Sequence, residues 1–160
     1  MALLQSHDRK AFDCGEESLN SYLQRFARQN ANRLVGITFV AVLPAQPERI
    51  AGYFTLSTSH IARELLTSEL PLPRYSVPAV LLARLAVDRD FQGLGVGGAL
   101  LSDVFSRVSR FASEVGLYAL EVSALHRQAR AFYERFGFLS LADEPDHLYL
   151  SVEKMRKLHL

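Results

Sequence analysis

The stretch that decides the fold is an apolar run, Leu81-Leu82-Ala83-Arg84-Leu85-Ala86-Val87-Asp88, which leads into Gln92-Gly93-Leu94-Gly95-Val96-Gly97-Gly98 and then a helical pattern. A strand that feeds a glycine loop and a helix builds an anion site, because backbone N–H groups point outward and the helix dipole adds about half a positive charge. Glycines suit such a loop, since side chains would block phosphates and restrict the backbone. The stretch therefore predicts a phosphate-binding loop.

A second motif, Ala129-Arg130-Ala131-Phe132-Tyr133-Glu134-Arg135-Phe136-Gly137-Phe138, lies nearer the C-terminus. It predicts a helix over 128–136 that ends at Gly137, because glycine is the usual residue just past a helix end. The two motifs in this order are more informative than either motif alone.

The rest of the chain predicts a mixed α/β layer, because strands and helices alternate only in its second half. Three prolines between 59 and 78 exclude a long element there, so we expect a mobile loop or substrate-facing flap with one helical turn at 62–66. The other predicted elements are helices over 16–30 and 96–115, strands over 36–43, 50–57, 118–123 and 148–152, a strand ending at Asp88, and a turn over 44–49.

Bulk composition predicts one intracellular domain over residues 1–160, with 49% hydrophobic residues to form its core. The single cysteine, Cys14, excludes an internal disulfide and a cysteine-based metal cluster, which suits a reducing cytoplasm. No apolar run approaches a membrane span, so we expect no membrane partner. A net charge of +1 gives no global attraction to nucleic acid, so such a partner requires a local basic patch.

Another nucleotide loop could explain the glycines. Gly93, Gly95 and Gly98 satisfy the dinucleotide-binding pattern, with Glu121 at the usual distance for a ribose contact. That pattern follows its strand directly and begins a domain, whereas here residues 88–91 intervene and the motif lies late in the chain. A P-loop is excluded because no Gly-Lys-Ser/Thr follows the glycines. The glycines therefore fit a dinucleotide-binding site poorly.

The motif Gln92-x-x-Gly95-x-Gly97 after a Leu-Ala-Val-Asp strand, followed by Ala131-Phe132-Tyr133 and Gly137-Phe138, resembles the acetyl-CoA-binding core of the GNAT acetyltransferase superfamily. The resemblance implies an α/β (mixed α+β) GNAT fold, in which a central, mostly antiparallel, splayed sheet is flanked by helices. It also implies that acetyl-CoA is the co-substrate.

Further segments resemble the GNAT toxins of bacterial type II toxin–antitoxin systems, and the likeness covers roughly residues 11–152. They are Phe12-Asp13-Cys14-Gly15, Leu19-Asn20-x-Tyr22-Leu23, Gly52-Tyr53-Phe54-Thr55-Leu56 and Leu82–Asp88. Those toxins acetylate the α-amine of aminoacyl-tRNA and are neutralised by a ribbon-helix-helix antitoxin. The resemblance therefore implies a cytoplasmic toxin that blocks translation, with charged tRNA and an antitoxin as partners. A homodimer is compatible with it.

The resemblance assigns a set of residues to the coenzyme, through main-chain contacts on the strand and diphosphate contacts in the glycine loop. They are Leu85, Ala86, Val87, Gln92, Gly93, Leu94, Gly95, Val96, Gly97, Gly98 and, lining the pocket, Phe132. It makes Tyr133 the general acid, since a phenol of pKa about 10 can protonate a departing thiolate. Packing against Phe132 and Phe136 is the alternative role for Tyr133.

No general base is evident, because the strand before Asp88 carries no acidic residue and has Arg84 instead. Freeing a lysine amine at pH 7 costs about 4–5 kcal/mol, whereas an α-amine of pKa about 8 costs only about 1–1.5 kcal/mol. We therefore expect an α-amine substrate that water can deprotonate. Aminoacyl-tRNA meets this requirement, as do a protein N-terminus and an amino acid.

Local basic residues are the candidate RNA contacts, with Arg28, Arg33, Arg74 and Arg84 as the selected set. The histidines show no ligand spacing, so no metal is assigned. Two other functions remain open: a GNAT acetyltransferase of a small amine or protein amino group, and a non-catalytic acyl-CoA-binding regulator.

Overall fold

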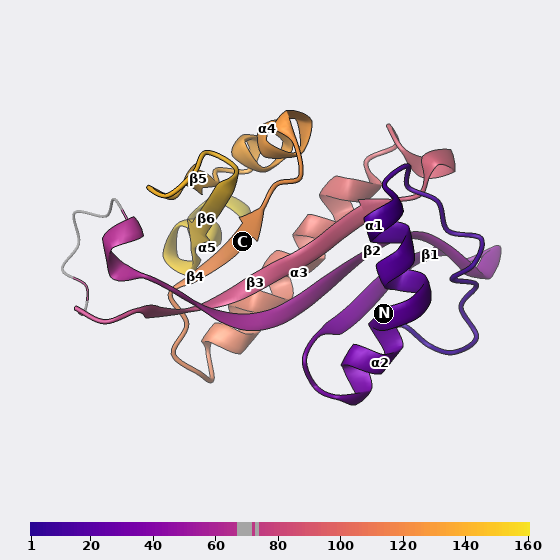
Figure 1. The fold of residues 1–160 in the computed structure, drawn as a ribbon, viewed down its shortest axis with the longest axis horizontal. Coiled ribbons are helices and arrows are strands. Elements are labelled where there is room, and N and C mark those ends of the chain that lie inside the picture. Colours follow the sequence, from indigo (N-terminus) through magenta and orange to yellow (C-terminus); the bar gives the residue numbers. More distant parts are fainter. Residues whose placement is uncertain (67–71, 73) are drawn as a thin grey trace. The chain divides into compact units, whose positions relative to one another are not determined.

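A computed structural model of the chain describes residues 1–66, 72 and 74–160. They divide into two compact units, Met1–Ser57 with Ala83–Asp103, and Thr58–Leu82 with Val104–Leu160. The strands that the structure describes form a six-stranded sheet in the order β1-β2-β3-β4-β6-β5 (Figure 1). Their bounds are β1 Ile37–Leu43, β2 Gln46–Ile61, β3 Val77–Val87, β4 Ala119–Ser123, β5 Leu139–Ser140 and β6 His147–Ser151.

The first unit begins with a helical segment that is continuous from α1 (Glu17–Ser21) through a π-helical turn, η1 (Tyr22–Phe26), to α2 (Ala27–Asn32). This segment confirms the helix predicted over 16–30. It lies against the β1–β2 hairpin (Figure 1), and a buried cluster forms the core of this unit. The buried members of that cluster are Phe12, Tyr22, Leu23, Ala27, Val40, Ile50, Tyr53 and Ala86.

The β1–β2 hairpin closes earlier than the sequence predicts. β1 confirms the strand expected over 36–43, but Leu43 pairs with Gln46, so only Pro44 and Ala45 remain in the turn. The turn predicted over 44–49 is therefore wrong at its far end. Pro47 is compatible with β2 because it lies in the exposed first residues of that strand, where a missing N–H costs little.

The second unit contains the C-terminal half of α3 (Val96–Ala112), then α4 (Arg127–Arg135) and α5 (Val152–His159). The helices predicted over 96–115 and 128–136 and the strand over 118–123 are confirmed within three residues. The predicted last strand is wrong at Val152, because the Ser151 hydroxyl accepts the N–H of Lys154 and starts α5. Neither α5 nor the short β5 is in the sequence-based prediction.

The stretch over 59–78, predicted to be a flap, is strand at both ends. β2 continues to Ile61 and β3 begins at Val77, which corrects the prediction there. The single helical turn predicted at 62–66 is confirmed as the 3-10 helix η2 (Arg63–Leu65). Residues 67–71 and 73, where the flap itself was expected, lie outside the described residues.

The predicted fold class is confirmed. β1–β2, β4–β6 and β5–β6 are antiparallel, and β3–β4 is parallel. The β3–β4 register runs from Ala79↔Ala119 to Leu82↔Val122, so the last residues of β3 lie beyond it. Of the helices that the structure describes, none has both the length and the apolar character needed to traverse a bilayer. A single domain over 1–160 stays a prediction.

We predict that Gly52→Ala destabilises the first unit by about 1–3 kcal/mol, because a core without space resists an added methyl group. A Cβ at Gly52 would lie 2.8 Å from Leu100 Cδ1 and 3.0 Å from the carbonyl oxygen of Ala86. Gly116→Ala is the matched control, since its Cβ would meet nothing within 4 Å. We expect it to change the free energy of unfolding by less than about 0.5 kcal/mol in urea titrations. Equal effects of the two variants would contradict the packing argument.

Candidate active site

The glycine loop connects β3 to α3 through a short 3-10 turn, η3 (Arg89–Phe91). Gly93 and Gly95 have φ values of +77° and +85°, which other residues rarely adopt. A Cβ at either position would meet nothing within 4 Å. The loop therefore needs these glycines for its backbone conformation, and the space beside them is open.

The loop leaves a run of backbone donors free. Among the described residues, none accepts a hydrogen bond from a backbone N–H between Gly93 and Gly98, and the first bond of the helix joins Ala99 N to Gly95 O at 3.0 Å. Donors at the N-terminus of a helix have no partner within the helix, and the helix dipole makes this end positive. The geometry thus suits an anion with several oxygen acceptors, such as a diphosphate.

Asp88 anchors the start of the loop, a role that the sequence analysis missed. The residue is only 4% exposed, and its carboxylate accepts the N–H of Asp13 at 3.0 Å and of Asp90 at 2.9 Å. Arg49 Nη2 lies 3.8 Å from the same carboxylate and also binds Asp90. The spacing of Asp88 and Asp90 at a strand end is a capping signal, but nothing local indicates the partner at position 13.

Gln92 holds the loop to the chain beneath it. Its side-chain amide donates to the carbonyl oxygens of Val87 at 2.9 Å and Cys14 at 3.1 Å. The Cys14 segment is itself fixed by Asn20, which accepts the Cys14 N–H at 2.9 Å and donates to Asp13 at 3.0 Å. The amide donors of Gln92, which we assigned to the coenzyme, thus serve the loop itself, and its side-chain oxygen makes no hydrogen bond with a described residue.

The strand residues that we assigned to the coenzyme lie at the C-terminal end of β3. Ala86 is buried in the core of the first unit, whereas Leu85 and Val87 are half-buried. All three lie beyond the β3–β4 register, which ends at Leu82. Their main-chain groups are therefore not engaged by that pairing.

Tyr133 lies on α4 in the second unit, and its side chain is only 5% exposed. Its ring packs 5.2 Å from the ring of Phe132 and 5.4 Å from that of Phe138. Burial raises the pKa of Tyr133 well above the usual value of a phenol. Phe132 itself is half-buried and also packs against Phe136 at 5.2 Å.

The Tyr133 hydroxyl is not completely enclosed. It makes no hydrogen bond with any described residue. Every fully enclosed side-chain oxygen or nitrogen in the described part of the chain has a hydrogen-bond partner. The unpaired hydroxyl oxygen of Tyr133 therefore cannot be fully enclosed. α4 is held in place by its ends: His126 Nδ1 accepts the Ala129 N–H at 3.2 Å, and Gly137 has a φ of +98°.

A family model for an acetyltransferase (GNAT) domain matches residues 35–139. The chain belongs to the GNAT acetyltransferase family. A tRNA-acetylating toxin from Mycobacterium tuberculosis (strain ATCC 25618 / H37Rv) is 37% identical over 155 residues, which cover 94% of this chain and 90% of that protein.

Two solved structures of the toxin AtaT resemble this GNAT chain. AtaT complexed with acetyl-methionyl-tRNAfMet is 29% identical, with a TM-score of 0.90 over 100% of this chain and 98% of that one. A tyrosine-to-phenylalanine variant of AtaT, bound to acetyl-CoA and to the C-terminus of the antitoxin AtaR, is 29% identical. Its TM-score is 0.81, over 99% of this chain and 95% of that one.

Glu121, the residue that a dinucleotide site would need, is committed elsewhere in this GNAT chain. It is buried on β4, where it binds the hydroxyl of Ser59, and its carboxylate lies 2.7 Å from His147 Nε2. Burial lowers the pKa of His147, but hydrogen bonds to Asp143 and Glu121 outweigh it and raise the pKa overall. No group of three His, Cys, Asp or Glu side chains in the described ranges is arranged to hold a metal.

The four arginines that we selected as RNA contacts form no ion pair with a described residue. Arg33 and Arg74 are exposed, and Arg28 and Arg84 are half-buried. The Arg84 guanidinium lies 3.7 Å from the centre of the Tyr22 ring. Three of the four belong to the first unit, and Arg74 belongs to the second.

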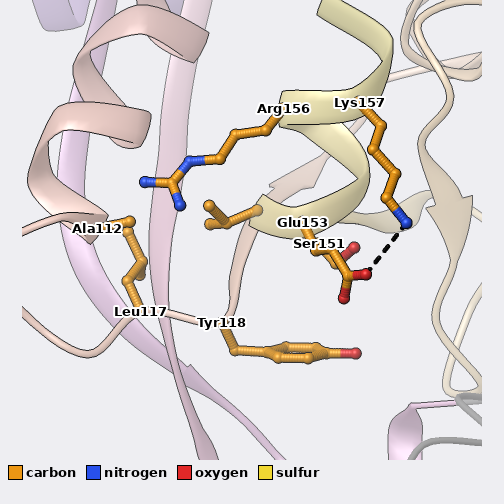
Figure 2. Close-up of a pocket in the computed structure, with 8 residues that line it drawn as sticks. Ala112, Leu117, Tyr118, Ser151, Glu153, Arg156 and Lys157 are labelled. Carbon is orange, nitrogen blue, oxygen red and sulfur yellow. Dashed lines mark hydrogen bonds and ion pairs between the residues drawn. The ribbon is translucent and has the colours of Figure 1, made fainter. Parts of the chain in front are cut away.

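An open groove of about 440 Å³ lies in the second unit beside α5 (Figure 2), and none of the predicted site residues lines it. Its charged side chains are engaged within the protein. Lys157 pairs with Glu153 at 3.2 Å, and Arg156 Nη2 donates to the carbonyl oxygen of Ser109 at 2.8 Å. The Arg156 contact holds α5 against α3, and each charged side chain that lines the groove has a partner within the protein.

We predict that Asp88→Ala lowers the free energy of unfolding by about 2 kcal/mol or more, because two backbone N–H groups lose their acceptor. The control is Asp90→Asn, whose side chain is 72% exposed and pairs with Arg49. An exposed ion pair contributes at most about 1 kcal/mol. Urea titration of both variants measures the difference, and equal losses would contradict the anchoring role of Asp88.

Proposed function

We propose that this chain is an acetyl-CoA-dependent N-acetyltransferase that acetylates the α-amino group of aminoacyl-tRNA and thereby blocks translation. The observation that carries this proposal is the glycine loop, which offers a run of free N–H groups at the start of α3. The resemblance to a tRNA-acetylating toxin and to AtaT with acetyl-methionyl-tRNAfMet supports the choice of acceptor. The same likeness supports a role as the toxin of a toxin–antitoxin pair.

The residues present fit acetyl-CoA. The open space beside Gly93 and Gly95, with the free donors up to Gly98, suits a diphosphate. Leu85, Ala86 and Val87 would offer main-chain groups to the pantetheine amides, and Phe132 would line the pocket. When bound, acetyl-CoA supplies an acetyl thioester, so that attack by an amine forms the N–C bond and breaks the C–S bond.

Tyr133 is the proposed general acid. Its hydroxyl gives a proton to the departing sulfur, and solvent then restores the phenol. The raised pKa keeps this hydroxyl protonated throughout the physiological range. Because it lacks a hydrogen-bond partner among the described residues, its proton is free for transfer.

The acceptor amine loses its proton to water. β3 carries no carboxylate before Asp88, and Asp88 already accepts hydrogen bonds from two backbone N–H groups. An α-amine of pKa about 8 is partly neutral at pH 7, whereas a lysine side chain is almost wholly charged. The chain thus favours an α-amine over a lysine as acceptor.

The partners follow from the same likeness. Arg28, Arg33, Arg74 and Arg84 are the proposed phosphate contacts, and a ribbon-helix-helix antitoxin is the proposed inhibitor. AtaT has been solved with the C-terminus of its antitoxin AtaR, which supports an antitoxin for this chain too. A homodimer and a cytoplasmic location, where charged tRNA occurs, complete the proposal.

Labelled acetyl-CoA tests the function directly. The protein is incubated with it and with bulk charged tRNA, a mixture of amino acids and a set of peptides. We expect label on the aminoacyl end of tRNA, and this label is released when the aminoacyl ester bond is hydrolysed. Label only on free amines or peptides would reject tRNA as the acceptor, and tight acetyl-CoA binding without any transfer would identify a non-catalytic regulator.

We predict that Tyr133→Phe lowers kcat by about 10²–10⁴-fold, since this is the usual contribution of a positioned proton donor. The dissociation constant for acetyl-CoA, measured by calorimetry, is expected to change by less than about twofold, because the ring remains. Tyr118→Phe is the matched control: its phenol lies in the groove of Figure 2 and has no proposed role. An unchanged kcat in Tyr133→Phe would remove this residue from catalysis.

We predict that the rate at low acceptor concentration rises about tenfold per pH unit below the α-amine pKa of about 8 and then levels off. No fall is expected up to about pH 9.5, because burial raises the pKa of Tyr133 above the phenol value of about 10. The profile is recorded between pH 6 and 9.5, where a descending limb would contradict Tyr133 as the acid.

A further inference from the structure

Arg84 is a half-buried cation without a counter-charge in the described part of the chain. Its guanidinium lies 3.7 Å from the centre of the Tyr22 ring, and it makes no hydrogen bond or ion pair with any described residue. Several other arginines of this chain have such partners. Arg49 pairs with Asp88 and Asp90, Arg89 with Asp13, and Arg130 with Glu134 and Asp146.

The ring under Arg84 is rigidly held. Tyr22 lies in the π-helical turn η1, is almost fully buried in the core of the first unit, and accepts a hydrogen bond from Asn30 at 3.3 Å. Tyr53 is buried in the same cluster, and its hydroxyl donates to the carbonyl oxygen of Leu19 at 2.7 Å. A guanidinium stacked on a fixed ring loses little further freedom on binding, and its N–H edges remain available.

Arg84 lies on a different face of the first unit from α3. Alternate residues of a strand share a face, and Ala86, two residues on, belongs to the cluster with Tyr22 and Tyr53. By contrast, a Cβ at Gly52 would touch Val96 and Leu100 of α3. The anion that Arg84 attracts is therefore separate from the diphosphate expected at the start of α3.

We infer that the Arg84–Tyr22 stack binds a backbone phosphate of the acceptor RNA. This inference rests on the proposed function. A guanidinium edge matches two oxygens of a phosphate, and an aminoacyl ester has no free carboxylate to compete for it. The contact selects an α-amine that is attached to RNA over one on a small molecule.

The test compares two acceptors, charged tRNA and an amino acid methyl ester, which has the α-amine but no phosphate. For Arg84→Gln we expect the KM for charged tRNA to rise at least tenfold. The KM for the ester, the KM for acetyl-CoA and kcat are expected to stay within about twofold. Loss of one phosphate contact is also expected to reduce the slope of log KM for tRNA against log salt concentration by about 0.7.

Two further variants make the result specific. Arg110→Gln removes the same charge from an exposed position on α3, and we expect it to leave every constant and the salt slope unchanged. Arg84→Lys keeps the charge but cannot stack or bind two oxygens in one plane, so a smaller rise confined to the tRNA KM is expected. If melting curves show that Arg84→Gln is misfolded, the same constants are compared in Arg84→Lys instead.

Each outcome decides a separate point. A KM that rises equally for the ester and for tRNA would make Arg84 structural, and a rise confined to acetyl-CoA would assign its anion to the coenzyme. An unchanged KM and salt slope for tRNA would overturn the inference while leaving the proposed function intact. A wild-type protein that acetylates the ester but never charged tRNA would overturn both.

Discussion

The carboxylate of Asp88 binds two backbone N–H groups, and the glycine loop depends on that interaction. It fixes the chain as β3 ends, joining the loop start to Asp13 on one side and to Asp90 on the other. Gln92 completes the attachment through the carbonyl oxygens of Val87 and Cys14. Because these side chains hold the loop in position, the N–H groups from Gly93 to Gly98 need no partner within the described chain and remain available for an anion.

The same division between engaged and free polar groups runs through both units. Glu121 and His147 satisfy each other, and Arg156 is bound to Ser109, so these charges stabilise the fold and have little left for a ligand. The loop amides, the Arg84 guanidinium and the Tyr133 hydroxyl are the contrasting set. Each is held by packing or by its neighbours' hydrogen bonds, and each keeps its own donors free. Donors that are rigid but unpaired bind an incoming acceptor without first breaking a bond.

Local signals account for what the sequence predicts well. The helix over 16–30, the glycine loop before a helix and the helix that ends at Gly137 depend on neighbouring residues, and the structure confirms these elements. The errors arise where distant residues decide. The extension of β2 to Ile61 needs a partner strand, and α5 is fixed by Arg156 on Ser109 and by His159 stacked 4.5 Å from Phe105. The partnership of Asp88 with Asp13 spans 75 residues, so no local pattern could reveal it.

In the proposed reaction the leaving thiolate must gain a proton and the acceptor α-amine must lose one. The thiolate must receive a proton, and burial raises the pKa of Tyr133, which favours the protonated hydroxyl at physiological pH. The α-amine must lose one, yet β3 offers Arg84 where a carboxylate would be needed. Water therefore takes the proton, and it can do so because an α-amine of pKa about 8 is already partly neutral at pH 7, whereas a lysine side chain is almost wholly charged.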